Sequence, residues 1–258
     1  MSYRKSTLLW AVALSLLAIL FLSIFPLFHN DINAAKKVLD GLPPAVRAGL
    51  GISLKNFFTI FGFFGYVFTY VTLAGAIQAT NLGVGALSRE DSGKTADFLL
   101  TKPISRNTIV TAKLLASVCS LVFTNLVFVV VAFVTAKAVS AEAFSSRTFL
   151  LVAASLFLIQ LAFMALGALL SVVIPKIKSV IAVTLPVVFV FFIISTFGSI
   201  IGSDWLSYVT PFKFYDATYI INHSGYDMKF VVIEAAFIIV AIAATYILYN
   251  TKDIRAAS

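Results

Sequence analysis

Long apolar runs separated by short polar segments set the pattern of this chain. Six of these runs reach the roughly 20 residues that an α-helix needs to cross a bilayer. Strands of a membrane β-barrel would show short alternating segments instead, and the sequence lacks them. We therefore predict an all-α polytopic membrane protein, one domain over 1–258, with spans at about 8–28, 57–86, 108–136, 148–174, 180–200 and 230–249. The second and third runs are long enough either to tilt or to project beyond the bilayer.

Two polar segments between the runs have patterns of their own. Residues 34–39 have a helical spacing that stops at Gly41 and at the pair Pro43 and Pro44, which predicts a short amphipathic helix. Residues 204–222 mix single charges with aromatic side chains, which favour the membrane–water interface. We expect a short interfacial or re-entrant helix there, with an ordinary external loop as the alternative.

Composition agrees with a membrane protein. Of the 258 residues, 60% are hydrophobic and 12% are charged, whereas soluble domains are about 45–50% apolar and about 25% charged. The net charge of +8 comes from residues that mostly flank the apolar runs, so we expect membrane lipid rather than nucleic acid as the surrounding partner. Arg4 and Lys5 precede an apolar run that is too long for a signal-peptide core, so we interpret it as a retained first helix.

The distribution of charges predicts the orientation. Six spans place both termini on one side, together with the polar segments 87–113 and 175–179. That side carries eleven basic and four acidic residues, and the opposite side carries eight basic and six acidic residues over a greater length. Because basic residues concentrate on the cytoplasmic side of membranes, we expect both termini in the cytoplasm.

Cysteine and histidine usage excludes some classes of function. Cys119 is the single cysteine, so no disulfide can form within the chain, and we expect it to be a small buried apolar residue. His29 and His223 lie far apart in separate polar segments, and no HExxH or CxxC motif is present. We therefore expect no metal site, and we find no nucleophile–base arrangement that would indicate an enzyme.

Gly93, Lys94 and Thr95 match the last three positions of a phosphate-binding loop. The full motif needs a glycine at the position that Ser88 occupies, on a strand–loop–helix unit. The residues before it belong to an apolar span, and the longest polar stretch is about 30 residues, far short of a domain. We therefore expect no nucleotide or other cofactor on this chain.

The same segment is better interpreted as a short helix between the second and third spans. Ser92 or Thr95 can cap its start, and Pro103 ends it. Ser105 can then cap the third span. The apolar side chains of the short helix fall on one face: Ala96, Leu99 and Leu100. A helix this short needs a covering surface, and its mixed charges favour a protein partner over lipid.

The segment resembles the permease subunits of ABC-2-type transporters. The resemblance rests on an acidic residue, a G-x-T triplet, a leucine pair, a P-x-S-R run and a following lysine, between the second and third spans: Glu90, Gly93, Thr95, Leu99, Leu100, Pro103, Ser105, Arg106 and Lys113. The six spans and the aromatic stretch before the last span agree with it. Some relatives begin with a long amphipathic helix, whereas about seven residues precede the first span here.

This resemblance implies an exporter subunit without its own catalytic site. It would form half of a membrane dimer with an identical or related permease, in the plasma membrane of a prokaryotic cell. Two separate ATPase subunits would bind ATP and Mg²⁺ and drive export of a hydrophobic or amphipathic substrate such as a peptide, lipid or drug. Residues 88–101 would be the coupling helix. The expected contacts with the ATPase are Glu90, Lys94, Thr95, Phe98, Leu99, Leu100, Lys102 and Arg106.

Polar residues inside the spans leave alternatives open. Glu234 is the clear charge within a span; it either reaches the surface or pairs with Lys213 or Lys229, or it belongs to a transport path. A self-contained ion-driven carrier or channel is the alternative function, and it would need such groups at mid-membrane. Interhelical hydrogen bonds are the simplest role for the neutral polar residues Gln78, Asn81, Asn125 and Gln160. The phenylalanines of 57–68 either pack in the core or line an apolar path.

Overall fold

Six long helices follow the six apolar runs. The computed structural model describes residues 3–30, 32–52, 56–92, 105–140 and 143–251. Each long helix is long and apolar enough to cross a membrane, which confirms the six-helix prediction. The helices are α1 (Tyr3–Asn30), α4 (Ile60–Ser92), α6 (Arg106–Val139), α7 (Ser146–Val173), α8 (Val180–Ile201) and α10 (Met228–Thr251). No strand occurs in the described part of the chain.

Short helices fill the segments between long ones. The predicted helix at 34–39 is confirmed as α2 (Ile32–Asp40), and the following prolines start a second short helix, α3 (Pro44–Gly49), which the pattern did not predict. The expected helix within 204–222 is three pieces: η1 (Trp205–Tyr208), η2 (Pro211–Lys213) and α9 (Ala217–His223). The last piece forms because the Asp216 carboxylate accepts hydrogen bonds from two backbone N–H groups of its first turn.

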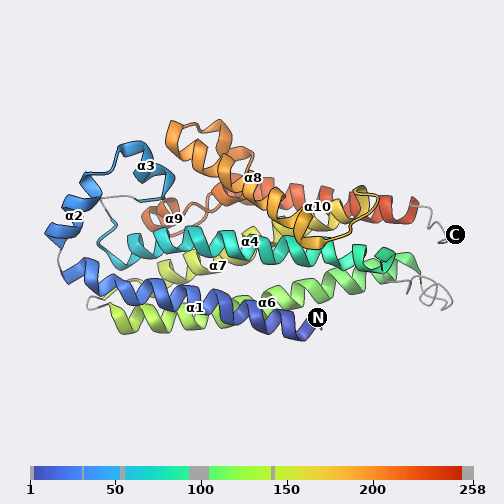
Figure 1. Cartoon of the computed structure of the whole chain (residues 1–258), viewed down its shortest axis with the longest axis horizontal. Coiled ribbons are helices and arrows are strands. Elements are labelled where there is room, and N and C mark those ends of the chain that lie inside the picture. Colours follow the sequence, from blue (N-terminus) through green and yellow to red (C-terminus); the bar gives the residue numbers. More distant parts are fainter. Residues whose placement is uncertain (1–2, 31, 53–55, 93–104, 141–142, 252–258) are drawn as a thin grey trace.

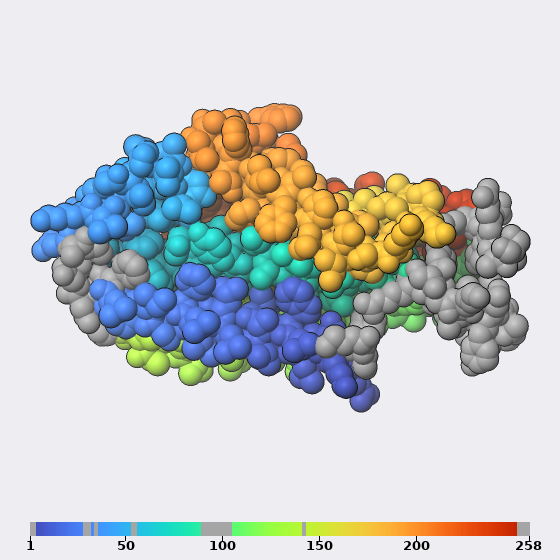
Figure 2. Space-filling view, in the orientation of Figure 1, coloured from blue at the N-terminus to red at the C-terminus, as the bar shows by residue number. Residues whose placement is uncertain are grey.

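Helix α4 runs through the middle of the bundle. It contacts α1, α6, α7 and α8, and Figure 2 shows it reaching the surface between α1 and α8. The short helices α2, α3 and α9 gather at one end of the molecule, and the C-terminus lies at the other (Figure 1). We call these the short-helix end and the C-terminal end.

At the C-terminal end of the bundle, α1 does not extend as far as α4 and α6 do. The Thr7 hydroxyl lies 2.6 Å from that of Ser120, fourteen residues after the start of α6. At 1.5 Å per residue, α6 therefore extends about 20 Å beyond that contact toward the C-terminal end. Figure 1 shows the N-terminus short of that end, whereas α4 and α6 reach it. The long second and third runs thus project past the first helix.

Glycines allow α4 and α7 to touch along their backbones. A Cβ added at Gly83 would lie 2.2 Å from the carbonyl oxygen of Met164, and one added at Gly167 would lie 2.6 Å from that of Thr80. Both distances are well inside van der Waals contact, so no side chain fits at either position. Small residues of this kind let membrane helices approach closely and gain dispersion contacts.

A buried polar cluster crosslinks α4, α6 and α7 near their midpoints. The Gln160 amide nitrogen donates to the Gln78 side-chain oxygen at 3.1 Å and to the Gly75 carbonyl at 3.2 Å. The Gln78 amide nitrogen donates to the Thr124 hydroxyl at 3.0 Å, and the Asn125 amide nitrogen donates to the Gln160 oxygen at 2.5 Å. The expected interhelical role of Gln78, Asn125 and Gln160 is therefore confirmed.

Phenylalanines pack the core between α4 and α7. The rings of Phe64 and Phe149 stack with centroids 4.2 Å apart, and both side chains are buried. The other buried phenylalanines of the 57–68 stretch are Phe57, Phe63 and Phe68. These rings supply core packing, which favours the first of the two roles considered for them.

The outer helices expose apolar faces. Within 18-residue apolar stretches of α8 and α10, 11% and 17% of residues are buried, against 61% for α7. Such faces suit lipid or another apolar surface. Cys119 belongs to an exposed face of α6, so the expectation that it is buried is wrong. The apolar run around it does not reveal which side of a membrane helix faces outward, because both sides are apolar.

The α4–α7 contact predicts a strong effect of one added methyl group. Gly83→Ala should destabilise the bundle by about 1–3 kcal/mol, because the helix backbones must separate to admit the new Cβ. Gly225→Ala is the matched control, since its Cβ would meet no atom closer than 3.9 Å. Thermal unfolding of the purified protein in detergent measures both variants; equal midpoints would contradict the close approach.

The polar cluster predicts a second stability difference. Gln160→Leu should cost about 1–3 kcal/mol, since interhelical hydrogen bonds in membranes average roughly 0.6 kcal/mol and their partners would remain buried. Ser155→Ala is the control on the same helix, because that buried hydroxyl bonds the Val152 carbonyl of its own helix. Unfolding in detergent with increasing dodecyl sulfate should separate the variants, and an equally large loss for the serine variant would refute a crosslinking role.

Candidate functional site

The start of α6 is fixed by a side-chain cap. The Ser105 hydroxyl accepts a hydrogen bond from the Thr108 backbone N–H at 3.2 Å, as the sequence predicted. This bond satisfies one of the free N–H groups of the first turn. Helix α6 therefore begins abruptly at Arg106, immediately after the segment 93–104, which lies outside the described residues.

The first turns of α6 bind the last turns of α10. The Arg106 guanidinium donates to the backbone carbonyls of Asn250 at 3.1 Å and of Tyr249 at 3.5 Å. The Asn250 amide donates to the Asn107 side-chain oxygen at 2.6 Å. A helix C-terminus has unsatisfied carbonyls and a partial negative charge, so a cation there is favourable. We call these bonds the α6–α10 joint.

An apolar cluster joins two further helices to this end. Its buried members come from the last turns of α4 and α7 and the first turns of α6: Ala86, Leu87, Val110, Leu114, Ala168 and Val172. Tyr246 of α10 packs against the cluster, and its hydroxyl lies 2.7 Å from that of Thr111. Four long helices are therefore connected where the chain enters and leaves the segment 93–104.

The predicted ATPase contacts are only partly within the described residues. Glu90 lies in the last turns of α4, and Arg106 forms the α6–α10 joint. The remaining predicted contacts lie outside the described residues: Lys94, Thr95, Phe98, Leu99, Leu100 and Lys102. Their role stays a prediction. The sequence did not reveal the bond from Arg106 to α10, because it joins positions 144 residues apart.

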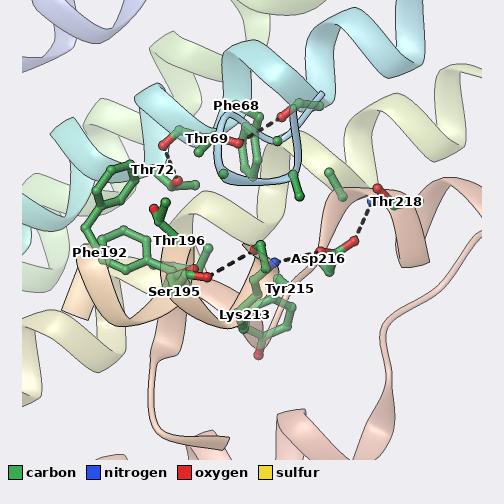
Figure 3. Close-up of a pocket in the computed structure, with 18 of the residues that line it drawn as sticks. Phe68, Thr69, Thr72, Phe192, Ser195, Thr196, Lys213, Tyr215, Asp216 and Thr218 are labelled. Carbon is green, nitrogen blue, oxygen red and sulfur yellow. Dashed lines mark hydrogen bonds and ion pairs between the residues drawn. The ribbon is translucent and has the colours of Figure 1, made fainter. Parts of the chain in front are cut away.

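A hydroxyl-rich cavity opens near the short-helix end. It has a volume of about 110 Å³ and lies among α3, α4, α8 and the η2–α9 segment. Figure 3 shows Thr69, Thr72, Ser195 and Thr196 around it, with Phe68 and Phe192 beside them. The hydroxyls of Thr69 and Thr72 bond carbonyls of α4 itself. The cavity thus combines hydroxyl groups with aromatic faces.

Glu234 is buried rather than paired with a lysine. Its carboxylate accepts a hydrogen bond from the Tyr215 hydroxyl, and 3% of the residue is exposed. Lys213 pairs with Asp216 at 3.6 Å, and Lys229 pairs with Asp227 at 3.3 Å. The expectation of a surface position or a lysine partner is therefore wrong, because the segment before α10 folds over this glutamate.

Two tyrosines of this segment, Tyr215 and Tyr226, are held in their neutral form. Burial, and secondarily the hydrogen bond to Glu234, raises the pKa of the Tyr215 hydroxyl above its usual range. Burial raises the pKa of Tyr226 to about 12. Tyr215 therefore acts as a hydrogen-bond donor at neutral pH. The aromatic stretch marked this segment in the sequence, but no pattern indicated that Tyr215 faces Glu234.

The described residues do not bring together a metal-binding group. No set of three histidine, cysteine, aspartate or glutamate side chains is close enough among them to hold an ion.

Comparison with known proteins identifies the family of this chain. A search of curated proteins finds no match. The family described as "ABC-2 family transporter protein" matches residues 2–254, nearly the whole chain. The resemblance seen in a short segment of the sequence therefore extends over all six helices. With that match and its six membrane-length helices, the chain belongs to the ABC-2 family of transporter proteins, a family of multi-pass membrane permeases.

Proposed function

We propose that this chain is the permease half of an ATP-driven exporter, with residues 88–101 as its coupling helix. Membership of the ABC-2 family implies partnership with ABC ATPase subunits. The observation that carries the proposal is the α6–α10 joint beside the segment 93–104. A force applied to that segment would reach α4 and α6 directly and α10 through three side-chain contacts.

The position of the segment suits an ATPase contact. Helix α6 begins about 15 Å beyond the start of α1, and α4 also reaches this end of the bundle (Figure 1). The excess of basic residues at this end favours the cytoplasmic side, where an ATPase would bind. Leu99, Leu100 and Phe98 would fill an apolar groove on the ATPase, with Glu90, Lys94 and Lys102 at its rim.

The complete transporter would contain two permeases and two ATPases. The exposed apolar faces of α8 and α10 leave surface for a second permease and for lipid. ATP and Mg²⁺ would be bound by the ATPases, which close on ATP and move the coupling helices. The exposed apolar side chains of the outer helices favour an amphipathic or hydrophobic substrate, such as a peptide, lipid or drug.

One observation keeps an ion-driven carrier as the second candidate. Glu234 is a buried carboxylate in a membrane-length helix, and among the described residues none donates to its second oxygen. Buried ionisable groups are frequent in proton pathways. However, Glu234 lies seven residues into α10, near its start, and the polar cluster at mid-bundle contains only neutral side chains. An ATP-driven mechanism therefore agrees better with the distribution of charge.

The coupling role predicts loss of the ATPase when the leucine pair becomes acidic. Leu99→Glu with Leu100→Glu should release the ATPase, because two carboxylates would have to enter an apolar contact. The matched control is Val38→Glu with Val46→Glu, two exposed valines at the short-helix end. Co-purification from membranes of the native host measures the effect. An ATPase that stays bound to the leucine variant would show that this segment is not the contact.

The α6–α10 joint predicts a local effect of removing Arg106. Arg106→Ala should speed amide hydrogen exchange in the last turn of α10 by about tenfold to a hundredfold, since a charge-assisted hydrogen bond contributes roughly 1.5–3 kcal/mol. Arg147→Ala is the control, because Arg147 is an exposed arginine in the first turn of α7. Hydrogen-exchange mass spectrometry reads both helices. Unchanged exchange near Asn250 in the first variant would remove the proposed link between the coupling segment and α10.

A further inference from the structure

A second cavity lies at the start of α10, within the segment 204–230. Its volume is about 430 Å³, and it shares Lys213, Tyr215 and Asp216 with the cavity of Figure 3. Its walls carry four tyrosines and two phenylalanines: Tyr208, Phe214, Tyr215, Tyr219, Tyr226 and Phe230. We call this cavity the aromatic cup. A volume of several hundred Å³ lined by rings is in the range of small-molecule sites.

The charges of the aromatic cup favour a cation. Three aspartates and two lysines line it, so its net charge is negative by one unit. Each lysine is already paired with an aspartate, Lys213 with Asp216 and Lys229 with Asp227. Asp204 is the third carboxylate, and it lies on the exposed rim at the start of η1. The excess negative charge is therefore at the open side of the cup.

A lysine of the chain itself already lies over two of the rings. The Lys229 ammonium nitrogen lies 4.8 Å from the ring centre of Phe230 and 5.8 Å from that of Tyr208. The two rings are neighbours, with centroids 5.2 Å apart. Aromatic faces attract ammonium groups through their negative quadrupole. The Lys229 side chain is 53% exposed, so a competing cation could displace it at little cost in packing.

We propose that the aromatic cup binds an organic ammonium ion with an apolar body. The ammonium would lie against Tyr208 and Phe230, where Lys229 now lies, with Asp204 as its counter-charge. The apolar body would fill the remaining space between the rings. Binding uses residues of this chain alone. The site therefore stands whether or not residues 88–101 contact an ATPase, and its test needs no ATPase.

Binding of benzyltrimethylammonium to the purified full chain tests the proposal. Calorimetry in an uncharged detergent should detect this cation and no comparable binding of benzenesulfonate, which has the same ring and the opposite charge. Tyr208→Leu should weaken binding of the cation by about threefold to tenfold, because it removes one ring face. Tyr208 is 47% exposed, so the variant should keep its unfolding midpoint.

Two lysine variants separate the ring site from general electrostatics. Lys229→Met and Lys213→Met remove the same charge from the same cup, but only Lys229 lies over the rings. We expect Lys229→Met to tighten binding about threefold or more and Lys213→Met to tighten it less. The proposal is overturned if the two variants bind equally well, if Tyr208→Leu binds like the unchanged chain, or if benzenesulfonate binds as tightly as the cation.

Discussion

The close approach of α4 and α7 is the contact on which the rest of the bundle depends. Gly83 and Gly167 bring the two backbones together, and the Gln160 side chain reaches across to Gly75 and Gln78. Lipid chains are as apolar as leucine, so burial alone cannot hold membrane helices together. Dense packing and interhelical hydrogen bonds supply the attraction instead. With α4 fixed against α7, the outer helices α1, α8 and α10 can expose apolar faces to their surroundings.

The two ends of this packed centre differ in kind. At the C-terminal end, a capped helix start, the α6–α10 joint and a small apolar cluster connect four long helices. At the short-helix end, the chain forms short helical pieces that enclose cavities and cover Glu234. The proposed ATPase contact lies beside the first end, and the cavities lie at the second.

The sequence predicted the architecture well because helix length and helix caps are local properties. Neighbouring residues were enough to predict the six membrane helices, the short helix α2 and the cap at Ser105. For contacts between distant positions, the sequence predicted that Gln78, Asn125 and Gln160 bond between helices, but it did not identify the partners. The Tyr215–Glu234 bond, the joint at Arg106 and the exposure of Cys119 depend on how helices rotate against one another. Apolar residues surround a membrane helix on all sides, so their pattern does not reveal that rotation.

In the proposed mechanism, an ATPase acts on the membrane bundle through residues 88–101. A photo-crosslinking amino acid placed at Leu99 tests it most directly, with the same amino acid at Val38 for comparison. After illumination of native-host membranes, the account predicts an adduct with an ATP-hydrolysing polypeptide from position 99 and none from position 38. An adduct from position 38 alone, or the absence of one from position 99 while the ATPase co-purifies, would contradict it.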